Sequence, residues 1–463
     1  MTWLQKVVAS WGWSVLACVA GTALLAVFVM IGGDWDWLVA LGDHVRSTGT
    51  IPDSVPFAAA DTAGWHNVPV LAELLASLMH AAGARTVVFV HLVAVAVSLA
   101  VLAAAARSRG ARDAAVAAAL GGLVLGSLAA LGIVRAQTLS LVPFALVVAL
   151  VVRQHRRPDR GVWWAVPLVA VWGNLHGAAL LGTCVLGAYL LLDRLRIRPV
   201  ETVAVGMASL AALCVTPQGW HTPSYYAQVF DNVSADRAEG LWARPSLSAP
   251  FDVLMLLAVA VLLVMVLRTR RPLWEYVAVA GLCLATASAA RHGVWLLFLL
   301  VVLAPRPATG EQGPKPAGVA MAPRSLLAGA VGCVAAALVV SLPLAAARGT
   351  SVLGAEPVVV DQVARVAGSV GDEAVVLAPS PLAEALAVAG VRLWAGNPLD
   401  AFRTPDQAAY LDFLDGRGSA SRAVESSNVV VVREGSPPES VVADDPAFTA
   451  RDCGGDWLCY VRD

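Results

Sequence analysis

Long apolar segments, separated by short polar ones, make up the first three quarters of this chain. A helix that crosses a bilayer needs about 20 apolar residues, because each residue rises about 1.5 Å along the axis. The pattern is typical of a polytopic α-helical membrane protein. It predicts about 11 transmembrane helices, at 11–33, 86–106, 113–133, 137–152, 161–174, 177–192, 200–216, 250–267, 273–288, 292–304 and 325–346.

Residues 68–82 differ from these spans, because Glu73 and His80 interrupt their apolar pattern. Such a segment is typical of an amphipathic helix that lies in the membrane interface. We therefore expect a surface helix here rather than a further span.

The pattern changes again from about residue 350. Short apolar runs at 374–378 ("AVVLA") and 428–432 ("NVVVV") predict buried strands. Periodic stretches near 359–370, 381–389 and 405–415 predict helices. The composition of 306–323 indicates a linker. We therefore expect two domains: a multi-span membrane domain at 1–349, with external loops 34–85 and 217–249, and a small α/β domain at 350–463.

Composition supports the membrane assignment, and charge gives the orientation. The chain is 58% hydrophobic and 14% charged. Of the 24 Lys and Arg residues before residue 350, 17 fall on one side of the predicted spans. Since basic loops stay in the cytoplasm, the N-terminus is predicted to be cytoplasmic and the C-terminal domain extracytoplasmic. No basic cluster with interleaved aromatic residues occurs, so we expect no nucleic-acid partner.

Two cysteines lie close together in the tail, Cys453 and Cys459 in "CGGDWLC". A disulfide between them would fit an oxidising compartment. A metal site is the other possibility, although no further Cys or His nearby completes one.

The polar residues of the membrane domain collect on the predicted outer side. The stretch "GGDWDWLVALGDH" (32–44) follows the first span, and further polar residues lie in the other outer turns. An ion-coupled transporter would place ionisable groups near the bilayer midplane, but these spans carry almost none. An enzyme on this side would need a donor carried by the membrane, and a lipid phosphate is the obvious carrier. Arginines could hold that phosphate, and a carboxylate could take a proton from an attacking hydroxyl.

Several motifs, in order along the chain, resemble those of a bacterial family with the GT-C fold, whose members are glycosyltransferases that use polyprenyl-phosphate sugars. The resemblance covers about residues 10–305. Its motifs are an acidic residue after span one, "GTIPDSVPF" (49–57), "WHNVPVLAELL" (65–75), "RAQTLSL" (135–141), "WGNLHGAALLG" (172–182), "TPQGW" (216–220), "EGLWARP" (239–245) and "ARHGVWLL" (290–297).

The resemblance implies a membrane glycosyltransferase that transfers a sugar from a polyprenyl-phosphate donor to a glycan, lipid or protein acceptor of the cell envelope. It implies Asp34 as the general base or a ligand of a divalent metal, Mg or Mn, and we add Asp36 as the second carboxylate. Arg135 and Arg291 would clamp the lipid phosphate. The remaining candidates for substrate binding are Trp65, Gln137, Asn174, His176, Trp242, Arg244 and His292.

The chain departs from the family pattern at several positions. Leu38 stands where members often have His, and Val68, Pro69 and Val70 replace a His-Glu-Trp motif. These departures leave open an alternative: a non-catalytic member that binds a lipid-linked glycan or scaffolds an envelope complex.

Simpler roles for the candidates also stay open. Asp34 could cap a helix, Trp35 and Trp37 could anchor the interface, and the arginines could snorkel to the head groups.

Overall fold

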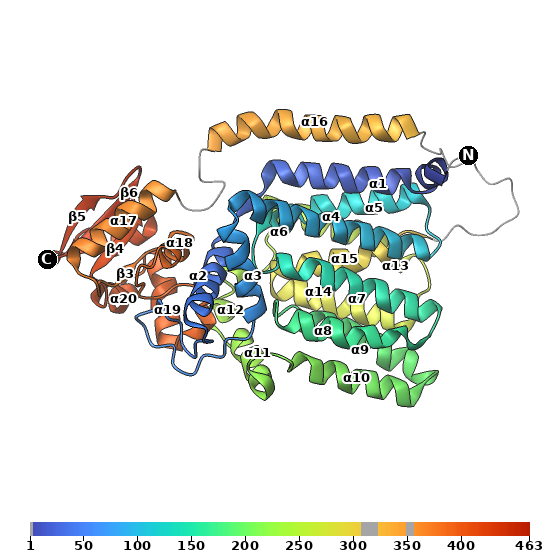
Figure 1. Cartoon of the computed structure of the whole chain (residues 1–463), viewed down its shortest axis with the longest axis horizontal. Coiled ribbons are helices and arrows are strands. Elements are labelled where there is room, and N and C mark those ends of the chain that lie inside the picture. The colour runs from blue at the N-terminus through green and yellow to red at the C-terminus, as the bar shows by residue number, and fades with distance from the viewer. Residues whose placement is uncertain (1–2, 307–322, 349–355) are drawn as a thin grey trace, which may run out of the picture.

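The structure is a computed structural model, and it describes residues 3–306, 323–348 and 356–463. Its larger part is a bundle of apolar helices that run side by side (Figure 1). Every predicted span overlaps one of them. The helices are α1 (Trp3–Phe28), α4 (Ala84–Ser108), α5 (Asp113–Gly126), α7 (Thr138–Arg156), α8 (Ala165–Gly173), α9 (Ala179–Leu192), α10 (Pro199–Leu213), α13 (Pro250–Leu267), α14 (Leu273–Ser288), α15 (Gly293–Leu303) and α16 (Pro323–Arg348).

The helices of the bundle differ in length. Within the described residues, four are long and apolar enough to cross a membrane by themselves: Ser10–Phe28, Ala84–Ser108, Thr138–Arg156 and Pro250–Leu267. The remaining apolar helices are shorter, so the number 11 stays a prediction. Helix α15 is buried at every position, which explains why its sequence is apolar on all sides.

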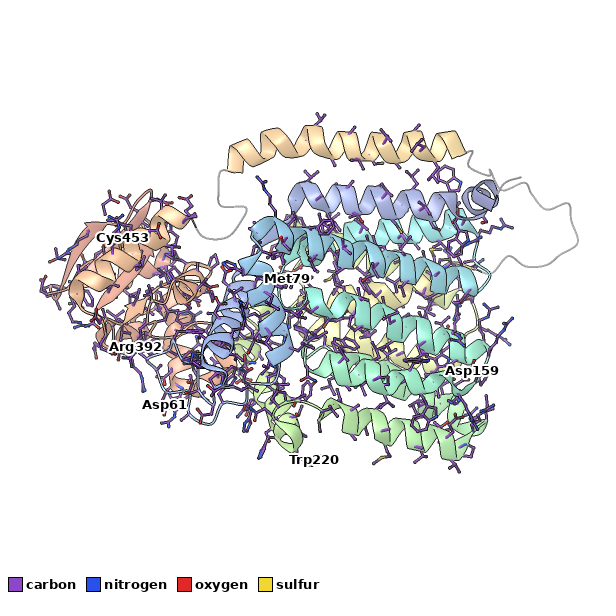
Figure 2. The ribbon with its side chains drawn as sticks, viewed as in Figure 1. Asp61, Met79, Asp159, Trp220, Arg392 and Cys453 are labelled. Carbon is purple, nitrogen blue, oxygen red and sulfur yellow. A yellow bond between two sulfur atoms is a disulfide. The ribbon has the colours of Figure 1, made fainter. Side chains whose placement is uncertain are left out.

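The two ends of the bundle differ in composition. The basic end carries the arginine-rich turns at 107–112, 153–160, 193–199 and 268–272, and Asp159 marks it in Figure 2. At the opposite end, which we call the polar end, lie α2 (Gly33–Thr48) and α3 (Val70–Ala81). Helices α11 (Thr222–Phe230) and α12 (Val233–Arg237) lie there too.

Helices α2 and α3 pack so closely that only glycine fits between them. A Cβ built at Gly42 would meet the carbonyl oxygen of Glu73 at 2.1 Å. Trp35 of α2 is 2% exposed and packs among Ile31, Leu38 and Val134. The prediction that Trp35 anchors the interface is therefore wrong, because the protein itself covers this ring.

The C-terminal residues form a mixed sheet with helices on both faces. The strand order is β3-β4-β6-β5, with β3 and β4 parallel and the other pairs antiparallel. The strands are β3 (Val376–Leu377), β4 (Val429–Arg433), β5 (Phe448–Asp452) and β6 (Trp457–Arg462); the helices are α17 (Pro357–Val370), α18 (Leu382–Val388), α19 (Thr404–Leu414) and α20 (Ser421–Glu425).

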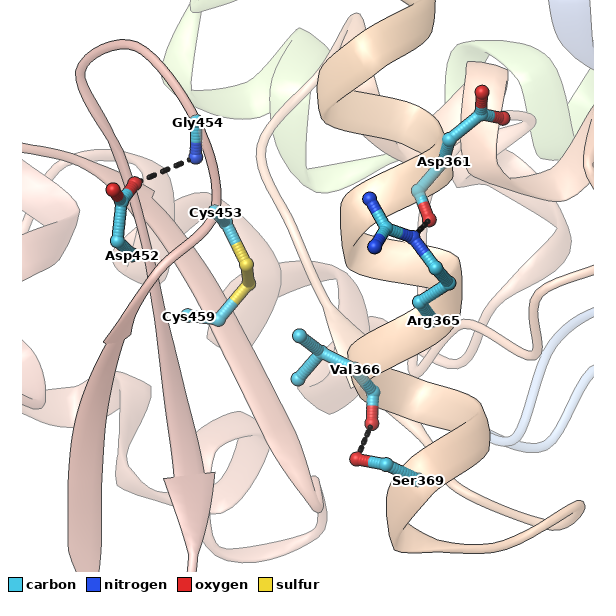
Figure 3. The surroundings of a disulfide bond; sticks show 8 residues. All are labelled: Asp361, Arg365, Val366, Ser369, Asp452, Cys453, Gly454 and Cys459. Carbon is cyan, nitrogen blue, oxygen red and sulfur yellow. Dashed lines mark hydrogen bonds between the residues drawn. A yellow bond between two sulfur atoms is a disulfide. The ribbon is translucent and has the colours of Figure 1, made fainter.

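The apolar run in β4 reflects burial on both faces of this sheet. Val429 and Val431 pack on the side of α17 and α18, whereas Val430 and Val432 pack on the side of α19 and α20. A disulfide between Cys453 and Cys459 closes the β5–β6 hairpin, with 5.7 Å between the Cα atoms (Figure 3). We call residues 356–463 the C-terminal module. The predicted boundary at 349/350 and nearly all of the predicted linker at 306–323 lie outside the described residues.

The C-terminal module docks on the polar end of the bundle (Figure 1). Backbone of the first external loop joins its sheet edge: Leu393 N–H donates to the carbonyl of Phe57 at 2.8 Å, and Ala59 N–H donates to the carbonyl of Leu393 at 2.7 Å. An ion pair of 2.7 Å between Arg237 and Asp412 adds a second attachment. Residues from both parts of the chain therefore meet at this interface.

Candidate functional site

A short parallel strand pair positions Asp34 beside Arg135. Strand β1 (Met30–Ile31) follows α1 and pairs with β2 (Ile133–Val134), which precedes Arg135. Directly after β1, the N–H of Gly32 donates to the carbonyl of Val134 at 2.9 Å. The exit of the first helix and the turn before α7 are thus fixed together, although a hundred residues separate them in the sequence.

Asp34 lies in the first turn of α2 and is not its cap. The helix begins at Gly33, its N-cap is Gly32, and no side chain makes the cap hydrogen bond. Burial raises the pKa of Asp34, and the guanidinium groups of Arg135 and Arg291 lower it. Among the described residues, no ion pair joins Asp34 to either arginine, so the groups influence one another across a gap. A carboxylate between two cations that it does not touch is suited to bind a charged substrate.

Arg291 is held by an aromatic ring. Its guanidinium carbon lies 3.7 Å from the ring centre of Trp242, which is a cation–π contact. The N–H of Ala290 donates to the carbonyl of Ala243 at 2.9 Å, so the two turns are also joined by backbone. His292 is buried, makes a hydrogen bond of 2.9 Å through Nδ1 to the carbonyl of Ala285, and packs edge-on to Trp242. It supports the arginine from behind.

His176 faces both arginines from the turn between α8 and α9. Burial and the charges of Arg291, His292 and Arg135 lower its pKa to about 3. The imidazole is therefore neutral at physiological pH. Its Nδ1 accepts a hydrogen bond of 3.1 Å from the N–H of Ala178, which leaves the proton on Nε2. His176 can thus donate one hydrogen bond without adding a charge.

Asn174 has a structural role in the same turn. Its amide donates to the carbonyls of Ala170 and Val215 at 2.8 and 2.6 Å. Its own carbonyl accepts from the N–H of Ala72 at 3.2 Å. The residue thereby ties three segments together, and this use of its side chain matches the satisfaction of backbone groups at a broken helix.

Tyr225 of α11 lies beside the next residue of this turn. A Cβ built at Gly177 would lie 3.5 Å from the Tyr225 hydroxyl. Burial, followed by the charge of Asp400, raises the pKa of Tyr225. Sequence analysis did not single it out as a site residue, because a Tyr-Tyr pair in an external segment is equally typical of an aromatic belt.

Two carboxyl groups of the C-terminal module approach the same centre, and neither was predicted. Glu384 of α18 is 1% exposed. Its Oε2 lies 3.1 Å from where a Cβ at Gly33 would be, and its Oε1 accepts a hydrogen bond of 2.6 Å from Asn397. Burial raises the pKa of Asp400, and Arg291 lowers it. Glu384 had a weak sequence signal, as the one acid in the apolar stretch "LAEALAV"; Asp400 had none.

Asp36 faces the module rather than the arginines. It is 8% exposed, and burial together with the charge of Glu384 raises its pKa to about 7. The structure therefore separates the two predicted carboxylates: Asp34 lies among Arg135 and Arg291, whereas Asp36 lies beside Glu384.

Three other predicted binding residues lie around this centre in different ways. Trp65 is 5% exposed, packs with Leu41 and Val55, and lines a cleft toward the C-terminal module. Gln137 is buried at the start of α7. Arg244 is exposed, and no contact of the described residues brings it to Asp34 or Arg291.

The donor set was compared with the needs of a divalent metal. Mg²⁺ and Mn²⁺ bind several carboxylate, carbonyl or water oxygens. Within the described ranges, no three Asp, Glu, His or Cys side chains cluster closely enough to hold an ion, and two guanidinium groups flank Asp34. The side chains alone do not make a metal site, so no step below uses one. A metal requirement stays a prediction, tested by transfer before and after chelation with EDTA.

The position of Leu38 bears on the missing family histidine. Its side chain is 0% exposed and packs with Trp35, Val39 and Ala72 in an apolar cluster. A residue at this place in α2 therefore lies within the core between α2 and α3 and not among the arginines.

Comparison with known proteins gives the fold. No family model and no curated protein sequence matches the chain. The archaeal oligosaccharyltransferase AglB from Archaeoglobus fulgidus, solved with an inhibitory peptide and a dolichol-phosphate, superimposes with a TM-score of 0.56 at 11% identity, over 100% of this chain and 75% of AglB. ArnT from Cupriavidus metallidurans, solved with undecaprenyl phosphate, gives 0.52 at 14% identity, over 97% of each chain. Both are GT-C glycosyltransferases. The chain has the GT-C fold.

The GT-C fold and the apolar helices make this a membrane protein. At identities this low, the likeness establishes the fold, and the activity must be argued from the site. In this chain the GT-C bundle carries its polar groups at one end, where the first external loop, the turns before α7, α9 and α15, and the C-terminal module meet.

Proposed function

We propose that this protein is a membrane glycosyltransferase that moves a sugar from a polyprenyl-phosphate donor to an acceptor of the cell envelope. One observation carries the proposal: Asp34, Arg135, His176 and Arg291, from four separate turns, face one another at the polar end of the bundle without forming ion pairs. The proposed site faces the extracytoplasmic side of the cell membrane, with the N-terminus in the cytoplasm, because the arginine-rich turns lie at the other end.

The residues would divide the work as follows. Arg135 and Arg291 bind the phosphate of the donor, since guanidinium groups match phosphate oxygens. An acceptor hydroxyl forms a bond to the anomeric carbon of the sugar, and the bond from that carbon to the phosphate oxygen breaks. The electron pair leaves with the polyprenyl phosphate, whose charge the two arginines stabilise, and the hydroxyl proton passes to Asp34. Burial favours this step, because it raises the proton affinity of the carboxylate.

The structural neighbours support a lipid phosphate as the ligand. AglB was solved with a dolichol-phosphate and ArnT with undecaprenyl phosphate. The neutral His176 suits the same ligand, because it can donate a hydrogen bond to a phosphate oxygen through Nε2.

The test is transfer by the purified full-length protein in lipid vesicles that contain polyprenyl-phosphate sugars, with envelope extract as the acceptor source. We expect release of polyprenyl phosphate and labelling of an acceptor. Asp34→Asn should lower the rate by about 10²–10⁴-fold, the usual contribution of a general base. The matched control is Asp53→Asn, an exposed aspartate of the same external loop, which should retain the wild-type rate.

Two results would contradict the proposal in different ways. Wild-type transfer by Asp34→Asn would remove this residue from the mechanism. A wild-type protein that binds the donor lipid but releases no polyprenyl phosphate with any acceptor would instead be the non-catalytic lipid-linked-glycan binder.

A further inference from the structure

A polar cleft of about 340 Å³ opens where the C-terminal module meets the bundle. Its wall is built from the first external loop (61–65), from α11 and the residue that follows it (227–231), and from the module (400–407). Small-molecule sites in proteins begin at roughly 300 Å³. Figure 2 places Asp61 at this junction. The cleft is thus large enough for one or two small rings and depends on the docking of the module.

The wall of the cleft carries excess negative charge. Its charged residues are three aspartates and one arginine. Arg403 and Asp61 form an ion pair near the opening, where both side chains are partly exposed. Among the described residues, neither Asp231 nor Asp400 forms an ion pair. Two carboxylates therefore remain for a ligand to satisfy.

Trp65 gives an independent sign that the cleft is built for a polar ligand. It lines the cleft and is 5% exposed, and its indole N–H has no hydrogen-bond partner among the described residues. A buried N–H without a partner costs free energy unless something binds it. Together with Gln228, which also lines the cleft, it adds donors to a wall that otherwise offers acceptors.

Asp400 connects the cleft to the proposed transfer site. It lies in the wall of the cleft, and it interacts electrostatically with both Arg291 and Tyr225. A group that enters the cleft and reaches Asp400 therefore arrives beside the arginine that is proposed to hold the donor phosphate.

We propose that this cleft binds the acceptor, and that the acceptor is a neutral, hydroxyl-rich group, a sugar residue of a glycan. The term acceptor rests on the proposed function; the binding of a neutral sugar does not. Sugar hydroxyls donate to carboxylates and also accept from the indole and amide N–H groups. An anionic lipid or a uronic-acid polymer would meet like charge, which disfavours binding. A basic peptide would satisfy the carboxylates but leave the indole N–H without an acceptor from its side chains.

The test is direct binding to the full-length protein in detergent micelles, measured by saturation-transfer NMR. The probes are a panel of neutral oligosaccharides, uronic-acid oligosaccharides of the same length, and an oligolysine peptide. We expect saturation of at least one neutral oligosaccharide and none of the acidic ones. The proposal is overturned if no neutral probe binds, or if the acidic probes or oligolysine bind more tightly than the neutral ones.

Variants then place the binding in the cleft. Asp400→Asn and Asp231→Asn should each weaken binding of the neutral probe about tenfold, the value of a hydrogen bond to a charged group. Asp372→Asn, an exposed aspartate of the same module outside the cleft, is the matched control and should bind normally. Asp231 is exposed, so its variant keeps the test valid if Asp400→Asn does not fold. Unchanged binding by both cleft variants would overturn the proposal.

This result can be separated from the fate of the proposed function. Neutral probes that bind in the cleft, together with no release of polyprenyl phosphate, would leave the cleft standing and remove the glycosyltransferase. Transfer with the same acceptor KM in wild type, Asp400→Asn and Asp231→Asn would leave the enzyme standing and remove the cleft as its acceptor site.

Discussion

The two ends of the helical bundle both contain buried charged side chains, but they use them in opposite ways. At the basic end the charges are paired. Glu275 is 1% exposed and forms an ion pair of 2.8 Å with Arg109, and Arg271 lies 3.8 Å away on its other side. Arg194 is 0% exposed and donates to Glu201 at 2.9 Å. At the polar end, no ion pair of the described residues includes Asp34, Arg135 or Arg291.

This difference indicates which charges serve the fold. A buried ion pair satisfies both partners and leaves nothing for a ligand, whereas separated charges around a gap can bind one. Ionisable residues at membrane depth are costly and usually functional, but the basic end shows that pairing is a second reason to keep them. Burial alone therefore does not identify a site in this bundle; burial without a partner does.

The largest expected effect is at the basic end, where one substitution would leave two buried cations unpaired. Glu275→Ala should lower the free energy of unfolding by about 3–5 kcal/mol. The measurement is thermal unfolding in micelles, with Asp53→Asn as the control. Transfer per folded molecule should be unchanged. A variant as stable as wild type would show that the pairs at the basic end do not hold the fold.

The next effect is at the polar end and should have the opposite character. Arg291→Gln removes a proposed phosphate ligand, so transfer should fall about 10²-fold. Stability should change by less than about 1 kcal/mol, because no ion pair is broken. Arg85→Gln, an exposed arginine at the start of α4, is the control. A large loss of stability with unchanged transfer would erase the contrast between the two ends.

The smallest effect concerns Glu73, a polar-end acid held by an amide instead of a cation. Asn67 donates to it at 3.0 Å, and burial raises its pKa to about 8. Because the folded protein holds this proton more tightly than the unfolded chain, the stability from it is complete below the ordinary pKa of glutamate, about 4.3. It is lost as pH rises through about 8.

The measurement is the melting temperature of wild type from pH 5 to pH 9. It should fall over this range, and Glu73→Gln should reduce the slope, because the variant carries the neutral group at every pH. Asp372→Asn should keep the wild-type slope. Equal slopes for wild type and Glu73→Gln would show that Glu73 is ionised in the folded protein.

Much of the helical part could be predicted because membrane helices must satisfy their backbone groups within each segment. An apolar run then maps directly onto a helix. The β5–β6 hairpin was not predicted, since four of the five residues of β5 are exposed and the strand has no apolar alternation. Trp35 was assigned to the interface because periodicity places a residue on a face but does not tell whether lipid or protein covers it.

The candidate site divides in the same way. Span order and charge bias sent Asp34, Arg135, His176 and Arg291 to one side of the membrane, and the structure brings these four together. Glu384 and Asp400 lie some 350 residues after Asp34, and only the docking of the module brings them near it. No local pattern encodes that docking, so the acids of the module could not be found from the sequence.

The backbone pairing between Phe57–Ala59 and Leu393 also has a consequence for biosynthesis. At about 5–20 residues per second, a ribosome makes residue 393 roughly 20–70 s after residue 58. During that interval the first loop has been threaded out of the translocon and its N–H and C=O groups face water. The cleft and the acidic part of the centre then form in one late docking event. A nascent or truncated chain therefore has the proposed phosphate ligands in place but no complete pocket, and activity should appear only on completed molecules.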